Sequence, residues 1–141
     1  MRCSSLMKTD IESCKCDEPV ESAAEKMKTR NVGFLPVCDE EGAVVGAVTD
    51  RDLVVRVLGE HRSTSDTVVR DVMTSELVCC SPDADLNEAE ELMASHRKSR
   101  ILCVDDRRRP VGVISLSDIA RAEEPARASR LLFAVAAREA L

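Results

Sequence analysis

The sequence repeats itself at a spacing of 66 residues, and this repeat restricts the possible folds more than any other feature. When the chain is shifted by that distance, residues 7–53 align with residues 73–119 without a gap. A gapless match of this length indicates a duplication, so both copies should form the same supersecondary unit. Identical pairs include Met7 with Met73, Cys14 with Cys80, Gly46 with Gly112, and Asp52 with Asp118.

Each copy has the residue pattern of a strand, a helix, two strands and a second helix. In the second copy, Leu86, Ala89 and Met93 recur at helical spacing, with charged residues on the opposite face. Short apolar runs bounded by turn residues predict the strands. The expected elements of this copy are strands at 76–80, 100–105 and 110–115 and helices at 84–96 and 116–124.

The repeat also predicts the fold class. A unit of about 60 residues buries too little apolar surface to be stable alone, so the two copies should share a core. We therefore predict an α/β (α+β) protein of two β-α-β-β-α repeats, related by a pseudo-twofold axis with their sheets face to face, plus a C-terminal helix. The expected boundaries are 1–58 for the first repeat, 59–69 for a linker, 70–124 for the second repeat and 125–141 for a helical tail.

The tail begins at Pro125, a residue suited to the first turn of a helix. Its apolar residues form a cluster rather than a clean stripe. Two interpretations remain open: the helix packs on the body of the protein, or it forms a contact between copies of the chain. The apolar residues are Leu131, Leu132, Phe133 and Val135.

Composition excludes several classes of function. The net charge of −6 argues against a dedicated nucleic-acid binder. No segment reaches the roughly 18 apolar residues of a membrane span, and the N-terminal residues lack the apolar core of a signal peptide, so we expect a cytoplasmic protein. Neither a nucleophile with its base nor a pair of catalytic carboxylates is evident, so we expect no enzyme and no catalytic cofactor.

Seven cysteines are many for such a chain. Their odd number and irregular spacing do not predict a disulfide framework, and they lack the paired spacing of a structural zinc site. We interpret them as small apolar residues of a reduced interior. The alternative is a metal or redox role, for which Cys14 and Cys16 would be the pair. The cysteines in expected strands are Cys14, Cys38, Cys79, Cys80 and Cys103.

Each repeat ends its third strand with the motif Gly-x-x-Thr/Ser-x-x-Asp. Thr49 and Ser115 stand where a helix begins, and such hydroxyls accept a hydrogen bond from a first-turn amide. Asp52 and Asp118, three positions on, can reach back to the cap's own amide. The same arrangement can hold a ligand, because the hydroxyl and the free amides suit a phosphate and the carboxylate suits the two hydroxyls of a ribose.

The duplication, the segment "VRDVMTSELVCCSPDADLNEAEELM" and the two motif copies resemble a tandem pair of cystathionine-β-synthase (CBS) domains, a Bateman module. The resemblance covers roughly residues 5–122. It implies a stand-alone regulatory module that binds adenosine-containing ligands (AMP, ADP, ATP, NAD or S-adenosylmethionine) in clefts between the repeats. It also implies a homodimer and a regulated partner protein whose identity is unknown.

The resemblance further implies which residues contact the ligand. In the family, a basic residue just before the second strand reaches the phosphates; this position holds Arg100 in the second repeat and Phe34 in the first. We therefore expect the site of Ser115 and Asp118 to be the stronger. Val113 and Ala47, two residues before each hydroxyl, are expected adenine contacts. From the opposite repeat we expect Lys15, Val20 and Gly33 at the second site, and Ser81, Leu86 and Ser99 at the first.

One other function remains open. In it, the chain is a ligand-free dimerisation or scaffolding module, and both motifs only cap helices. Phe34 in the position of the basic residue favours this alternative, as does the absence of an attached output domain.

Overall fold

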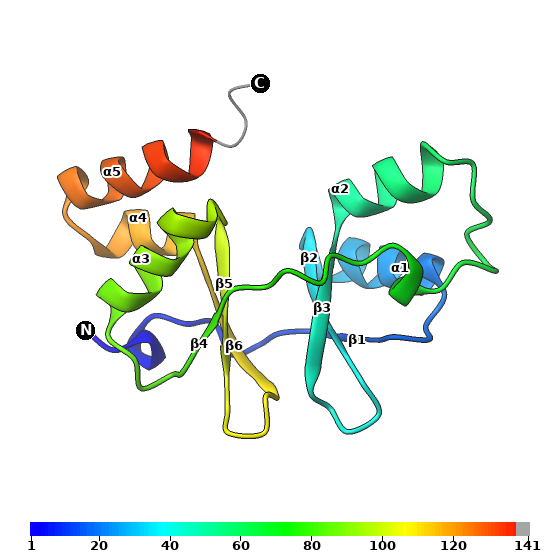
Figure 1. The fold of residues 1–141 in the computed structure, drawn as a ribbon, viewed down its shortest axis with the longest axis horizontal. Coiled ribbons are helices and arrows are strands. Elements are labelled where there is room, and N and C mark those ends of the chain that lie inside the picture. Colours follow the sequence, from blue (N-terminus) through cyan, green and yellow to red (C-terminus); the bar gives the residue numbers. More distant parts are fainter. Residues whose placement is uncertain (138–141) are drawn as a thin grey trace. The chain divides into compact units, whose positions relative to one another are not determined.

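The computed structural model describes residues 1–137, which divide into two compact units (Figure 1). The first unit is the continuous segment Ile11–Leu77, and the second combines Met1–Asp10 with the chain from Val78 onward. Within the described residues, each unit contains one three-stranded sheet. The predicted α/β class, with two copies of a β-α-β-β-α unit followed by a C-terminal helix, is confirmed.

The two sheets have the same strand order and directions. In each, a short first strand runs parallel to the second, which is antiparallel to the third. The elements of the first unit are β1 (Cys14–Lys15), α1 (Val20–Arg30), β2 (Phe34–Cys38), β3 (Val44–Thr49) and α2 (Asp50–Asp52), which continues as a π-helical turn, η2 (Leu53–Leu58). Those of the second are β4 (Cys79–Cys80), α3 (Leu86–His96), β5 (Arg100–Val104), β6 (Pro110–Ser115), α4 (Leu116–Ala122) and α5 (Pro125–Ala136).

Helices α1 and α3 pack on their sheets through the same positions of the repeat. Leu86, Ala89 and Met93 of α3 are at most 1% exposed and belong to one apolar core, as their helical spacing predicts. The equivalent residues of α1 belong to a separate core in the first unit. Each unit therefore has a core of its own.

Each sheet is extended by the segment that precedes the other repeat. The backbone of Lys8 pairs with Val113 of β6, with N–O distances of 2.9 and 3.0 Å. In the same way, Thr74 pairs with Ala47 of β3, at 2.8 and 2.9 Å. Residues 1–10 therefore lie in the unit of the second repeat, whereas the sequence repeat alone groups them with the first.

These paired segments explain the glycine of each motif. A Cβ atom on Gly112 would lie 2.5 Å from the sulfur of Met7, and one on Gly46 would lie 2.8 Å from the sulfur of Met73. Both distances are shorter than van der Waals contact. Glycine at positions 46 and 112 therefore allows the segments around Thr74 and Lys8 to lie against β3 and β6.

Helix α5 packs against α3 and α4 of its own unit, as one interpretation of the tail predicts. Its residues Leu131 and Val135 are buried, and Arg127 pairs with Glu90 of α3. Leu132 and Phe133 are 53% and 81% exposed, so the expected contact between copies stays a prediction. None of the helices in residues 1–137 is both long and apolar enough to cross a membrane.

Candidate functional site

Ser115 and Asp118 form a complete capping box at the start of α4. The amide of Asp118 donates to Ser115 Oγ at 3.2 Å, and the amide of Ser115 donates to Asp118 Oδ2 at 3.0 Å. This geometry confirms the predicted helix-capping role of the motif. It also fixes the carboxylate beside the end of β6.

Lys8 is the second partner of Asp118. Its ammonium lies 3.3 Å from Asp118 Oδ1, and the side chain of Lys8 is 61% exposed whereas that of Asp118 is only 6% exposed. Burial opposes ionisation of Asp118, but the hydrogen bonds from Ser115 and the charge of Lys8 outweigh it and lower the pKa of the carboxyl. Asp118 is therefore a carboxylate at neutral pH.

A cavity of about 490 Å³ opens beside this motif, within the second unit. Ser99, Arg100, Ser115 and Ser117 form its polar wall, and residues of α4 and α5, including Leu132, form the rest. Arg100 reaches this position because it pairs with Ser115 in the register of β5 and β6. With Ser129 of α5, the cavity thus offers a cation and four serine side chains beside an apolar surface, a combination typical of small-molecule sites.

The first motif has the same capping box. The amide of Asp52 donates to Thr49 Oγ1 at 3.1 Å, and the amide of Thr49 donates to Asp52 Oδ2 at 3.0 Å. The neighbours differ, because Phe34 of β2 pairs with Thr49 where Arg100 pairs with Ser115. The strand position that holds Arg100 at the second motif is therefore uncharged at the first.

Thr74 and Arg56 hold Asp52 instead. The hydroxyl of Thr74 donates to the carboxylate at 3.3 Å, and Arg56 Nε lies 3.9 Å from Asp52 Oδ1. Arg56 also donates to the backbone carbonyls of residues 72 and 73. Arg56 thus also ties the backbone of its own unit to the helix that carries Asp52.

The structure also places the other predicted site residues. Val113 is half-buried and Ala47 is buried, and each is bridged by the segment that extends its sheet. Val20 and Leu86 lie in the apolar cores, at 2% and 1% exposure, and their amides donate to the carbonyls of Thr67 and Met1. Their cross-repeat contacts stay predictions.

Gly33 and Ser99 occupy equivalent places beside the two capped helices. The carbonyl of Gly33 accepts from the amide of Asp50 at 3.0 Å, and that of Ser99 accepts from the amide of Leu116 at 2.8 Å. Gly33, which we predicted at the second site, therefore lies beside the first motif, and Ser99, which we predicted at the first site, lies beside the second.

The two remaining predicted contacts are exposed residues at strand ends: Lys15 is the last residue of β1, and Ser81 directly follows β4. Lys15 donates its amide to Glu18 at 3.0 Å, and Ser81 Oγ accepts from the amide of Asp83 at 3.1 Å. Neither side chain is committed to a core, so both are available to a ligand. Their contacts also stay predictions.

Sequence reasoning missed the three side chains that contact the motif carboxylates. Lys8 and Thr74 occupy matched positions of the repeat, 66 residues apart, so the alignment held a usable signal. Once the bridges Lys8–Val113 and Thr74–Ala47 are known, this pair of residues predicts that Asp118 and Asp52 have different partners. Arg56 lies four residues after Asp52 on the same helix, a spacing at which side chains meet.

A family model for the CBS domain matches residues 3–59 and 69–124. The chain belongs to the CBS domain family. The two matches coincide with the two sequence repeats, so the chain carries a CBS domain pair. The resemblance drawn from the motif copies is confirmed.

Known proteins resemble this CBS domain pair over most of its length. The chain is 40% identical over 120 residues to the uncharacterized protein YlbB of Bacillus subtilis, covering 84% of this chain and 80% of YlbB. A conserved CBS domain protein of unknown function from Thermoplasma acidophilum, TA0289, has a TM-score of 0.81 at 23% identity, over 95% of this chain and 75% of that one.

A third similar protein was solved with ligands. The CBS domain pair of protein MJ0100, in complex with 5′-methylthioadenosine and S-adenosyl-L-methionine, has a TM-score of 0.76 at 23% identity, over 86% of this chain and 94% of that one. At this identity the likeness shows a shared fold.

Proposed function

We propose that this CBS domain pair is a regulatory module that binds an adenosine-containing ligand at Ser115 and Asp118 and signals its presence to a partner protein. One observation carries the proposal: in the second unit a cavity of about 490 Å³ joins the motif serine to Arg100. Protein MJ0100, which has the same fold, is a CBS domain pair solved with two adenosine compounds. The likeness supports the ligand class.

Each polar group of the site has a chemical task in this proposal. Arg100 presents a planar guanidinium suited to paired phosphate oxygens. The hydroxyl of Ser115 can donate to a further phosphate oxygen. Asp118 keeps acceptor capacity beyond its bonds to Ser115 and Lys8, because an ionised carboxylate has about four lone-pair directions. That capacity suits the two hydroxyls of a ribose.

The balance of charge favours a phosphorylated ligand at the second motif. Arg100 and Lys8 flank the end of β6 from its two sides, since one pairs with Ser115 and the other bridges Val113. The matched positions of the first unit hold the uncharged Phe34 and Thr74. AMP, ADP, ATP and NAD carry negative charge, so the second motif should prefer them to S-adenosylmethionine.

Titration calorimetry of the full chain with AMP, ATP, NAD and S-adenosylmethionine tests the proposal. The chain has no Trp and no Tyr, so a nucleotide that co-purifies would dominate its ultraviolet spectrum. We expect saturable binding of a phosphorylated ligand, weakened in an Arg100→Ala variant and retained in an Arg107→Ala control on the β5–β6 turn. The absence of binding and of any thermal shift with all four compounds would refute the proposal.

A second candidate function is a ligand-free dimerisation or scaffolding module. Two observations favour it: both capping boxes are complete without a ligand, and Phe133 on α5 is 81% exposed. Light scattering at several concentrations separates the candidates when combined with the calorimetry. A dimer that binds none of the four compounds, and that becomes monomeric with Phe133→Glu, would favour the scaffold.

A further inference from the structure

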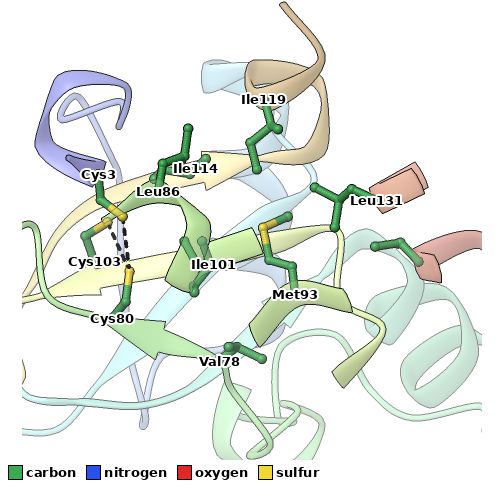
Figure 2. Close-up of a cluster of buried hydrophobic side chains, with 12 residues drawn as sticks. Cys3, Val78, Cys80, Leu86, Met93, Ile101, Cys103, Ile114, Ile119 and Leu131 are labelled. Carbon is green, nitrogen blue, oxygen red and sulfur yellow. Dashed lines mark hydrogen bonds between the residues drawn. The ribbon is translucent and has the colours of Figure 1, made fainter. Parts of the chain in front are cut away.

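Three buried thiols meet inside the second unit (Figure 2). Cys3 comes from a 3-10 turn, η1 (Cys3–Ser5), Cys80 from β4 and Cys103 from β5. The sulfur of Cys80 lies 3.8 Å from that of Cys3 and 3.8 Å from that of Cys103, and all three sulfurs lie within 4.8 Å of one another. Their side chains are 0%, 8% and 0% exposed, in the order Cys3, Cys80, Cys103.

The first unit shows that this fold does not need thiols at these places. The matched positions, 66 residues apart in sequence, hold Val69 for Cys3 and Val37 for Cys103, and both valines are 0% exposed. Only Cys80 has a cysteine, Cys14, as its counterpart. Two valines and one cysteine therefore satisfy apolar packing at these positions, so packing does not require the two additional sulfurs of the second unit.

We propose that Cys3, Cys80 and Cys103 form a binding site for one thiophilic cation with a filled d shell. Soft thiolate ligands select Cu(I) and Zn(II) among biological metals. A cation bound at about 2.3 Å to each sulfur sets the sulfurs about 3.8 to 4.0 Å apart, which two of the three pairs already match. The site needs only a small approach of Cys3 and Cys103.

The number of ligands distinguishes the two cations. Within residues 1–137, no further histidine, cysteine or carboxylate places a ligand atom in this group. Zn(II) is usually coordinated by four ligands, so its fourth ligand here would be a solvent molecule on the slightly exposed side of Cys80. Cu(I), the softer of the two, accepts three thiolates, so we expect it to bind more tightly.

Binding exchanges protons for the metal. The thiolate, not the thiol, is the form that ligates a metal. Each thiol that becomes a ligand forms one metal–sulfur bond and gives one proton to solvent, and no electron is transferred. The metal must therefore be supplied in its binding oxidation state.

The site would also fasten the N-terminal segment to the sheet. Cys3 lies five residues before Lys8, and its amide donates to the carbonyl of Ala84 at 2.9 Å. A cation shared by Cys3, Cys80 and Cys103 adds a link from this segment to β4 and β5. Metal loading should consequently raise the temperature at which the second unit unfolds.

Competition titrations on the reduced, metal-free full chain test the proposal. Cu(I) is titrated against a chromophoric Cu(I) chelator and Zn(II) against a zinc indicator. Because the chain lacks Trp and Tyr, the charge-transfer absorption of metal thiolates is readable in the ultraviolet. We expect one equivalent of metal per chain.

The repeat supplies variants that should fold. Cys3→Val and Cys103→Val copy Val69 and Val37. Each should weaken metal binding by more than about a hundredfold, which exceeds the loss expected for a residue that only contacts a ligand of the metal. Cys38→Val copies Val104, removes a buried thiol outside the group and should bind like the wild type. Thermal unfolding without metal checks that all three variants are folded.

Two results would overturn the proposal. One is a wild-type chain that takes up neither cation in competition with the chelators. The other is folded Cys3→Val and Cys103→Val chains that bind as tightly as Cys38→Val.

Discussion

The ammonium of Lys8 lies 3.3 Å from Asp118 Oδ1, although the two residues are 110 positions apart in the sequence. The matched pair of the first unit is Thr74 and Asp52, in which a hydroxyl replaces the ammonium. The duplicated motifs thus have identical caps and different electrostatic surroundings. This difference leads to the first two predictions.

Replacing either motif aspartate by alanine should weaken adenosine-ligand binding unequally. We expect Asp118→Ala to reduce the affinity for AMP or ATP at least about tenfold more than Asp52→Ala, because the second motif has Arg100 and a cavity beside it. Both variants lose a capping box, so both should lose about 1 kcal/mol of stability and serve as controls for each other. Calorimetry gives the affinities, and equal or reversed losses would show that this ranking of the sites is wrong.

Replacing Lys8 by threonine copies the residue found at position 74. The variant keeps the backbone bridge to Val113 but removes the ammonium from Asp118. We expect affinity for ATP to fall roughly tenfold and affinity for the uncharged 5′-methylthioadenosine to change little. An equal loss for both compounds would mean that Lys8 acts only by positioning Asp118.

Acid should weaken the second unit through Asp118. A carboxyl with a lower pKa in the folded than in the unfolded chain stabilises the fold above its unfolded pKa, and that contribution is lost as the pH falls through the folded pKa. Asp118→Asn removes the charge and keeps an acceptor. We therefore expect the variant to be less stable than the wild type by about 1 kcal/mol at neutral pH, with the gap closing as the pH falls through the lowered pKa of Asp118.

Urea unfolding at neutral and at acidic pH measures this difference in stability between the variant and the wild type. An Asp106→Asn variant controls for the general effect of losing a carboxylate, because Asp106 is exposed and lies outside the motif. A gap that persists in acid would assign the loss to packing rather than to charge.

Adding a methyl group at Gly112 should push the N-terminal segment away from β6. The new Cβ would lie 2.5 Å from the sulfur and 2.7 Å from Cγ of Met7. We expect Gly112→Ala to cost about 1–3 kcal/mol in urea unfolding, the range of overpacked sites. The same substitution should cost less when it is made in a Met7→Ala chain, because the shorter side chain leaves room for the new methyl group. If Gly112→Ala costs as much in that chain as in the wild type, the strain does not come from Met7.

Much of the fold was predictable because the duplication displays each element twice. Helix α3 buries Leu86, Ala89 and Met93 as their spacing predicts, and Ser115 and Thr49 cap helices as their chemistry predicts. These are local relationships, set by residues a few positions apart. Their signal lies within a single turn or strand.

What could not be predicted depends on distant parts of the chain. No local pattern tells that Met1–Asp10 pairs with β6, so the partner Lys8 was missed. The alternative metal or redox role of the cysteines was placed at Cys14 and Cys16, because they lie near the charged N-terminal segment. The group of three thiols instead joins Cys3, Cys80 and Cys103, which only the folded second unit brings together.

The exchange of leading segments between the repeats has a consequence for how the chain folds. All residues of the first unit lie in one continuous stretch, Ile11–Leu77, so that unit can form as soon as this stretch is synthesised. The second unit must wait for its last strands while its first ten residues are already made, and it closes a loop that contains the entire first unit. Loop closure of this kind slows folding more than it lowers stability. The first unit should therefore fold early and the second late. The N-terminal segment can pair with β6 only after that strand has formed.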